Sequence, residues 1–254
     1  MPEGDGVTQP VGASDGTSEG AAACSVDVRL TMLARTPLFR GLEDHEIEGV
    51  NARCRARAVQ PGELVFRWGE PAESLFVIAT GQVKLMEHAS DGRLVVLDLF
   101  GPGEFFGSAP ALGDDAYTYD AQAVTAGCVL ALSAETFERI LHDVPLVALN
   151  ALALTSQRLR DAQQTVHALS TLAVEAQVAA TLLRLAAKFG EVGPAGTRLE
   201  AALTQVDLAA MSGTTPESVN RVLSAFRRRG LVDSGRGWFV LKDRAALEAL
   251  KDSH

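Results

Sequence analysis

The spacing of hydrophobic residues changes once along this chain, and that change limits the folds that it can adopt. From about Ala56 to Leu132, short apolar stretches alternate with turn sequences such as Pro-Gly, Ser-Asp-Gly and Gly-Pro-Gly-Glu. Several short strands at roughly even spacing are typical of an antiparallel sandwich or barrel. The tripeptide Ser90-Asp91-Gly92 lies between two of these stretches, 82–87 and 93–99, and predicts a hairpin turn.

After Pro145, which the first turn of a helix tolerates, the hydrophobic period becomes helical. The pattern alternates intervals of three and four residues, as in the heptad seam of a coiled coil. The seam residues are Leu149, Leu152, Ser156, Leu159, Gln163, Val166 and Ser170. One amphipathic helix packed on its own core would show the same spacing. A long helix between two compact parts has little core to face, and this favours a dimer. A further helix over 173–188 and a loop over 191–200 follow.

The carboxy-terminal part contains the pattern of a helix-turn-helix, in which two helices cross closely. Ala209 supplies the small residue at the crossing, Gly213 can take the positive φ of the turn, and Val219 anchors the second helix. The segment 231–241 predicts two strands that form a wing. An ordinary helical hairpin with a charged surface is the competing interpretation.

The second helix of this motif is predicted to read DNA. Thr215 and Pro216 are a typical helix start, and Gly230 is a typical end. Recognition helices place their first residues against base edges in the major groove. The predicted DNA-binding residues are Gln205, Thr215, Pro216, Glu217, Ser218, Asn220 and Arg221.

Each of these side chains has a predicted role. Arg221 can pair with guanine through two hydrogen bonds, and Glu217 can accept one from the amine of cytosine. Gln205 and Ser218 lie near helix starts and are predicted to contact phosphates, which fixes the register on the duplex.

Charge supports the same division of the chain. The net charge is −9, but residues 171–254 hold 11 Lys and Arg against 9 Asp and Glu, while the preceding residues hold 12 against 23. The carboxy-terminal part is therefore the better candidate to meet the phosphates of DNA.

The amino terminus and the cysteines give the evidence on the cellular compartment of the protein. Residues 1–28 are rich in Gly, Ser, Ala and acidic residues, which predicts a disordered tail; a translation start placed too early would explain them equally well. No apolar run approaches the ~18 residues of a membrane helix, and no secretory signal is visible. Cys24, Cys54 and Cys128 are too few and too scattered for a disulfide framework, which predicts a reducing cytoplasm.

The order of these parts resembles the cyclic-AMP receptor protein / fumarate–nitrate regulator (Crp/Fnr) family of bacterial transcription factors. The matching segments are PLFRGL at 37–42, PGE at 61–63, the run 69–85, GPGEFFG at 101–107, Ser133-x-x-x-Phe137, and 204–223. Glu217 and Arg221 match the pair with which the family reads DNA. Pro216 replaces an Arg of the cyclic-AMP receptor, so this helix looks closer to the fumarate–nitrate branch.

The resemblance implies an α+β fold and a division into four parts. These are the tail (1–28), a cyclic-nucleotide-binding-like antiparallel β-roll (29–143), a dimerisation helix (144–171) and a winged helix-turn-helix (172–254). It further implies a homodimer that binds a two-fold symmetric DNA operator and contacts RNA polymerase. We expect a transcription regulator, an activator, and not an enzyme.

The predicted effector pocket departs from the family pattern. Members that bind cyclic AMP use a Glu for the ribose, an Arg-Ser pair for the phosphate and a Thr-Ser for adenine. The altered or vestigial pocket positions are Gly107, Ser108, Tyr117, Thr118, Ala162 and Gln163. No Lys or Arg occurs between Leu94 and Glu138, and a buried phosphate without a cation carries a heavy desolvation cost.

These departures predict a regulator that is active without a small-molecule ligand or other cofactor. Tyr117, Gln163 or both are expected to fill part of the vacant pocket. The alternative is a cyclic-AMP-dependent regulator with a non-standard pocket, in which backbone amides cradle the phosphate. A third possibility is a nucleotide-gated module whose DNA-binding domain is secondary.

The residues present also argue against other effectors and against an enzyme. The iron–sulfur branch needs four cysteine ligands, but Cys24 stands alone near the amino terminus, and Cys54 and Cys128 are expected to be small buried hydrophobes. The histidines show no metal spacing, and His167 beside the seam is expected to be a solvated imidazole rather than a haem ligand. A metal-dependent cupin would need closely spaced histidines, and His88 alone lies between His45 and His142.

Overall fold

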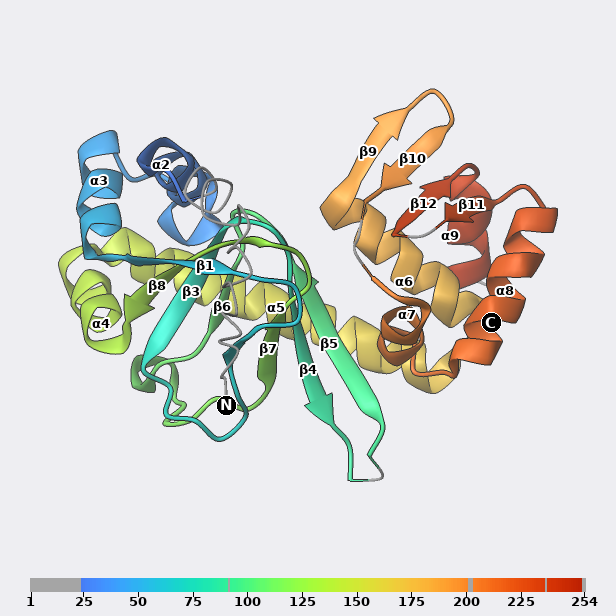
Figure 1. The fold of residues 1–254 in the computed structure, drawn as a ribbon, viewed down its shortest axis with the longest axis horizontal. Helices are drawn as coiled ribbons and strands as arrows, with labels where there is room; N and C mark the ends of the chain where they lie inside the picture. The colour runs from blue at the N-terminus through green and yellow to red at the C-terminus, as the bar shows by residue number, and fades with distance from the viewer. Residues whose placement is uncertain (1–23, 91, 201–202, 236, 253–254) are drawn as a thin grey trace, which may run out of the picture.

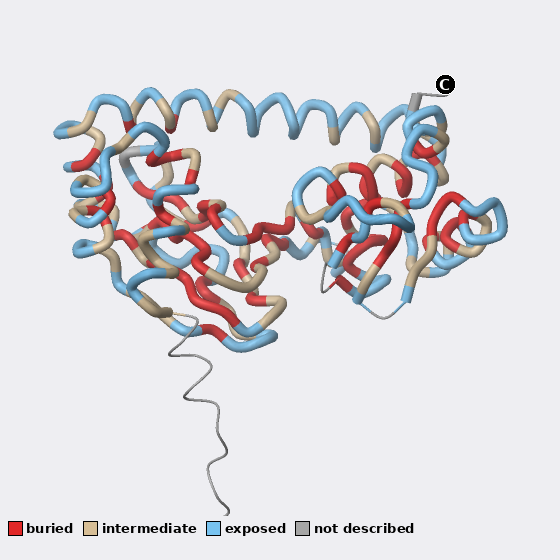
Figure 2. The backbone as a smooth tube through the Cα atoms, turned by 90° about the horizontal axis from the view of Figure 1, so that it is seen from above, coloured by how far each residue is buried: buried red, intermediate tan, exposed pale blue. Residues whose placement is uncertain are grey.

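Two α+β domains lie along one long helix, α5 (Pro145–Thr171), in the computed structural model (Figure 1). The structure describes residues 24–252 except 91, 201–202 and 236. The amino-terminal domain packs against the first half of α5, and the carboxy-terminal domain lies beside its second half (Figure 2). The predicted order of β-domain, long helix and winged helix-turn-helix is confirmed. In the described part of the chain, none of the helices has the length and apolar character that a membrane span requires.

The amino-terminal domain begins with α2 (Val26–Arg35), the short 3-10 helix η1 (Pro37–Phe39) and α3 (Asp44–Arg53). The side chain of Ser25 accepts a hydrogen bond from the Val28 N–H and so starts α2. The first helix therefore begins inside the predicted tail of 1–28; residues 1–23 of that tail lie outside the described residues.

A disulfide joins Cys24 to Cys128, 104 residues further along the chain, with their Cα atoms 5.5 Å apart. This corrects three predictions. The cysteines are not too scattered to form a disulfide, so they do not indicate a reducing cytoplasm. Cys24 does not stand alone, and Cys128 is not a free buried thiol. Both cysteines belong to the hydrophobic cluster between α2 and the sheet, so only tertiary packing brings them together. Cys54 is free and partly buried, and burial raises its thiol pKa to about 11.

Two four-stranded antiparallel sheets form the β-roll, in the orders β1-β8-β3-β6 and β2-β7-β4-β5. The bounds are β1 (Arg55–Val59), β2 (Leu64–Phe66), β3 (Ser74–Thr80), β4 (Val83–His88), β5 (Leu94–Phe100), β6 (Phe105–Gly107), β7 (Asp120–Ala123) and β8 (Gly127–Ser133). The 3-10 helix η2 (Pro110–Leu112) precedes β7, and α4 (Ala134–Asp143) follows β8. The predicted hairpin joins β4 to β5; Asp91 itself lies outside the described residues. β1 and β7 were not predicted, because RARAV and DAQA lack an apolar run.

The long helix α5 is buried only near its start, at Val147 and Ala151. Beyond that point it stands largely exposed beside both domains (Figure 2). Its predicted seam includes four large hydrophobic side chains that are mostly exposed, namely Leu149 (63%), Leu152 (65%), Leu159 (61%) and Val166 (63%). Ser156 is half-buried, and Gln163 and Ser170 are exposed. In a single chain, therefore, no core covers the seam.

The carboxy-terminal domain combines four helices with one four-stranded sheet of order β11-β12-β10-β9. Its elements are α6 (Val174–Phe189), β9 (Gly190–Gly193), β10 (Gly196–Leu199), α7 (Gln205–Met211), α8 (Pro216–Arg228), β11 (Val232–Gly235), β12 (Trp238–Leu241) and α9 (Arg244–Asp252). The predicted wing is present as β11 and β12. The predicted loop at 191–200 is wrong, because residues 190–199 form a hairpin whose second strand pairs with β12. Gly190, Gly193, Pro194 and Gly196 are typical of loops, and they concealed that pairing.

Candidate nucleic-acid interface and ligand pocket

The helix-turn-helix has the geometry that its sequence predicted. Ala209 and Val219 are 1% and 0% exposed, as expected for residues buried between two helices that pack on each other. Gly213 has a φ of +62°, and a Cβ there would lie 2.8 Å from the Leu169 side chain of α5. The positive φ therefore favours glycine at the turn, whereas the Leu169 methyl group is the end of a flexible side chain and could move aside.

The second helix, α8, begins and ends at the predicted residues. The Thr215 hydroxyl accepts a hydrogen bond from the Ser218 N–H, and Pro216 occupies the first turn. Gly230 follows the helix with a φ of +72°. The buried side of α8 consists of Val219, Val222, Leu223 and Phe226.

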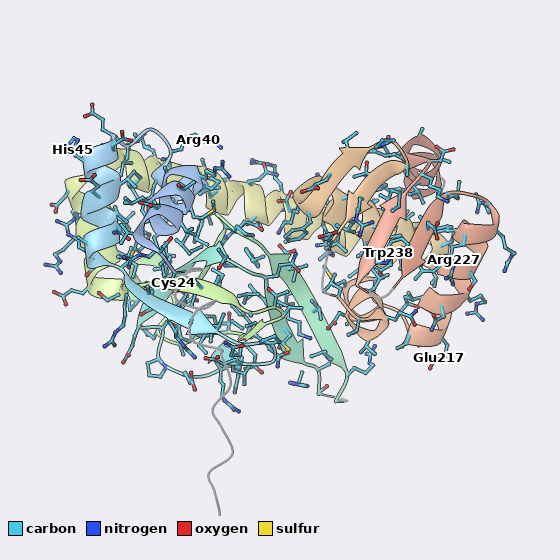
Figure 3. The ribbon with its side chains drawn as sticks, turned by 45° about the horizontal axis from the view of Figure 1, so that its top comes forward. Cys24, Arg40, His45, Glu217, Arg227 and Trp238 are labelled. Atoms are coloured by element: carbon cyan, nitrogen blue, oxygen red, sulfur yellow. A yellow bond between two sulfur atoms is a disulfide. The ribbon has the colours of Figure 1, made fainter. Side chains whose placement is uncertain are left out.

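The opposite side of α8 is exposed and polar. Glu217, Asn220 and Arg221 all lie on it, and Figure 3 shows Glu217 at the outer end of the helix. Its own backbone N–H and the Thr215 hydroxyl hold the pKa of Glu217 below the ordinary value, so the carboxylate is ionised at neutral pH. An ionised carboxylate is the acceptor that a cytosine amine requires.

A short chain of hydrogen bonds links the first turn of α8. The Arg221 guanidinium donates to the Ser218 hydroxyl oxygen at 3.1 Å, and the Thr215 hydroxyl oxygen lies 3.2 Å from the same atom. The Ser218 hydroxyl oxygen therefore accepts a hydrogen bond within the helix, and the predicted donation of its hydroxyl to a phosphate stays a prediction. Gln205 is exposed at the first position of α7, where its predicted phosphate contact is sterically open.

The end of α8 adds positive charge that the motif-based prediction omitted. Arg227 and Arg228 are exposed in the last turn, and Figure 3 shows Arg227 on the outer surface. Arg229 instead pairs with Glu175 of α6. The run of three arginines in the sequence was the available signal for this basic end.

The interior of the β-roll is occupied by its own aromatic side chains. Tyr117, at an altered pocket position, is 5% exposed and stacks on Phe66 with ring centroids 3.7 Å apart. Its hydroxyl donates to the Ser74 carbonyl oxygen at 2.9 Å and accepts from the Ser74 N–H at 3.1 Å. Phe76 and the fully buried Phe106 pack beside Phe66. Tyr117 is thus held by both packing and hydrogen bonds.

The other altered positions differ in their surroundings. The Ser108 hydroxyl donates to the Asp114 carboxylate at 2.5 Å, and Gly107 has a φ of +93° close to the Ser74 carbonyl oxygen. Thr118 is exposed. Ala162 and Gln163 are also exposed on α5, whereas Tyr117 is buried among the side chains of the β-roll.

A cation reaches the β-roll from α5, outside the segment in which the sequence had none. The Arg158 guanidinium donates to the Phe105 carbonyl oxygen and lies 4.0 Å from the Phe105 ring centroid and 5.4 Å from that of Phe100. Burial lowers the pKa of Arg158, although an arginine remains protonated. The absence of Lys and Arg from 94–138 therefore did not mean that no cation lies beside the β-roll, although Arg158 as a whole residue is exposed to solvent.

A β-roll joined through a long helix to a winged helix-turn-helix defines a class of DNA-binding regulators, and comparison with known proteins agrees. Residues 56–143 match the cyclic nucleotide-binding domain family, and residues 176–250 match the Crp-like helix-turn-helix domain family. The chain is 33% identical over 218 residues to the cyclic AMP receptor protein of Thermus thermophilus, covering 85% of this chain and 96% of that one.

Two solved structures extend the similarity to the fold. A transcriptional regulator of the CRP family from Thermus thermophilus is 30% identical, with a TM-score of 0.65 over 78% of this chain and 97% of that one. FixK2 from Bradyrhizobium japonicum is 24% identical, with a TM-score of 0.72 over 79% and 98%. This chain belongs to the Crp/Fnr family of transcription regulators.

Proposed function

We propose that the protein is a homodimeric transcription activator that binds a two-fold symmetric operator and is active without a small-molecule ligand. The observation that carries this proposal is the polar side of α8, on which Glu217, Asn220 and Arg221 are exposed next to a well-capped helix start. DNA as the target places the protein in the compartment that holds the chromosome, the cytoplasm. RNA polymerase is the partner that an activator needs.

The proposed dimer rests on the exposed seam of α5. Leu149, Leu152, Leu159 and Val166 form one apolar strip on a helix that no core covers in the single chain. A second copy would bury the same strip through a parallel coiled coil, with the polar Ser156 and Gln163 available to fix its register. Two recognition helices related by that two-fold axis would match a palindromic operator.

Ligand independence rests on the side chains inside the β-roll. Tyr117 occupies its altered position through stacking and two hydrogen bonds, and a nucleotide would have to displace it. The Ser108 hydroxyl is bound to the Asp114 carboxylate, whose negative charge would repel a nearby phosphate.

A cyclic-AMP-dependent regulator is the second candidate, and Arg158 is the observation that favours it. Its guanidinium lies at the β-roll and could pair with a phosphate in place of the missing arginine. The 33% identical protein from Thermus thermophilus is named a cyclic AMP receptor. No catalytic role is proposed for any residue.

The experiment that tests sequence-specific recognition compares cognate and random DNA. The wild-type protein first selects a binding site from a library of random duplexes. Arg221→Ala should then weaken binding to that site by about 1–3 kcal/mol, the usual contribution of a two-bond contact with guanine, and change binding to random DNA far less. Arg55→Ala, at an exposed arginine of β1, is the matched control and should change neither. Equal losses on both duplexes would make Arg221 a phosphate contact.

A further inference from the structure

The β-roll and the DNA-binding domain share a hydrophobic contact next to the helix-turn-helix. Val96 and Leu99 of β5 are 3% and 0% exposed and belong to the same buried cluster as Leu203 and Leu208 of the carboxy-terminal domain. Strand β5 packs directly against α7 (Figure 1). The two domains are therefore connected by side-chain packing as well as by the chain at the corner between α5 and α6.

One buried ion pair crosses this contact. The Lys84 ammonium of β4 lies 2.7 Å from the Asp207 carboxylate of α7, and the two side chains are 13% and 4% exposed. The other carboxylate oxygen of Asp207 accepts hydrogen bonds from the Thr204 N–H at 2.9 Å and the Thr204 hydroxyl at 2.6 Å. Asp207 therefore serves two functions, because it both closes the first turn of α7 and binds the β-roll.

The environment of Asp207 keeps it charged. Burial alone would raise its pKa, but the hydrogen bonds from Lys84 and Thr204 outweigh burial and hold the pKa below the ordinary value. Removing the lysine would leave a buried carboxylate without its counter-charge, so the contact would reopen to water.

A second ion pair between the domains is less protected from solvent. The Lys188 ammonium of α6 lies 2.9 Å from the Asp98 carboxylate and 3.1 Å from that of Glu104. Lys188 and Asp98 are 25% and 29% exposed, so solvent and salt screen this pair more strongly. Lys84 is therefore in the less screened of these two charged links, and of the two lysines it alone contacts the helix-turn-helix.

Contacts at both ends fix the direction of α7. Lys84 holds its first turn, and Leu169 of α5 lies against the turn at Gly213 that follows its last residue. The buried crossing at Ala209 and Val219 then makes α8 move together with α7. Lys84 is therefore one of the residues that hold the recognition helix relative to α5, together with the hydrophobic packing of β5 and the Lys188 ion pairs.

We propose that Lys84 is a positioning residue for DNA recognition, which through Asp207 fixes the recognition helix relative to the dimer helix and so sets the half-site spacing that the dimer accepts. This inference rests on the proposed function. In a two-fold dimer, a fixed angle between α5 and α8 fixes both the distance and the rotation between the two recognition helices. Since one base pair rotates a half-site by about 35°, a rigid dimer should reject operators whose spacing changes by one base pair.

The test uses full-length protein and three kinds of duplex: the selected operator, the same operator with one base pair inserted or deleted at its centre, and a single half-site. The wild-type protein should bind the altered spacings at least about tenfold more weakly than the selected operator. Lys84→Met should bind the selected operator about tenfold more weakly than wild type and distinguish the spacings by less than about threefold, with an unchanged half-site affinity. Lys84→Arg keeps the charge and should restore the preference for the selected spacing.

The controls separate positioning from folding and from the proposed function. Arg57→Met removes an ion pair with Glu63 inside the β-roll and should keep the wild-type spacing preference. If Lys84→Met loses half-site binding because it does not fold, Lys84→Gln, whose shorter and uncharged side chain keeps a polar end but not the ion pair with Asp207, replaces it with the same expected result. A folded Lys84→Met or Lys84→Gln variant with the wild-type spacing preference overturns this inference alone. A wild-type protein that selects no operator overturns the proposed function instead.

Discussion

Substituting glutamate for both Leu152 and Leu159 should convert the protein from a dimer to a monomer. These side chains are 65% and 61% exposed in the single chain, so a partner helix has most of each leucine still to cover. Complete burial of a leucine side chain contributes about 1.5–3 kcal/mol to the stability of a protein or complex. Covering only the exposed part of each leucine in the dimer would therefore contribute about 1–2 kcal/mol. A dimer contains each position twice, so the double substitution removes about 4–8 kcal/mol before any charge repulsion.

That loss corresponds to an increase of roughly three to six orders of magnitude in the dimer dissociation constant. Sedimentation velocity at micromolar protein concentration measures it directly, and far-UV circular dichroism checks that α5 remains helical. Val192→Glu is the matched control, because Val192 is 90% exposed at the β9–β10 hairpin, away from the seam. An unchanged dimer in the double variant would show that the seam is not the dimer interface. A monomeric wild-type protein would show that the protein does not form the proposed dimer.

Further predictions concern the interior of the protein. Tyr117→Phe should lower the free energy of unfolding by about 1–3 kcal/mol in urea titrations, because it leaves the two backbone groups of Ser74 without their partner; an unchanged stability would show that the hydroxyl contributes nothing. Protein purified and denatured without reductant should show one reactive thiol per chain, at Cys54, and three after reduction. Three in the first measurement would exclude the Cys24–Cys128 disulfide. Because the pKa of Cys54 is about 11 against an ordinary 9.0, its alkylation at pH 8 should be about a hundredfold slower than that of an exposed cysteine and should rise steadily toward pH 11. A rate that levels off near pH 9 would contradict the burial of this thiol.

The helix-turn-helix was predictable because local chemistry specifies it. Thr215 and Pro216 start α8, Gly213 makes the turn, and Gly230 ends the helix, all within a short segment. The seam of α5 was equally visible, because a helical period depends only on neighbouring residues.

The features that the sequence did not reveal depend on contacts between distant residues. The Cys24–Cys128 disulfide spans 104 residues, and Arg158 reaches the β-roll from a helix that follows the predicted pocket segment. The pair of Lys84 and Asp207 joins residues 123 positions apart. The neighbouring sequence of these residues does not indicate their partners. No motif could therefore have paired them before the fold was known.

The proposal that the apo protein is already active has one direct test. Binding of the wild-type protein to its selected operator is titrated by electrophoretic mobility shift, without nucleotide and with millimolar cyclic AMP. A ligand shifts a conformational equilibrium only by its different affinity for the two states. Since Tyr117 and its neighbours occupy the β-roll interior, the two dissociation constants should agree. A tightening of tenfold or more, about 1.4 kcal/mol of coupling, would contradict ligand independence and favour the cyclic-AMP-dependent regulator, with Arg158 as the cation for the phosphate.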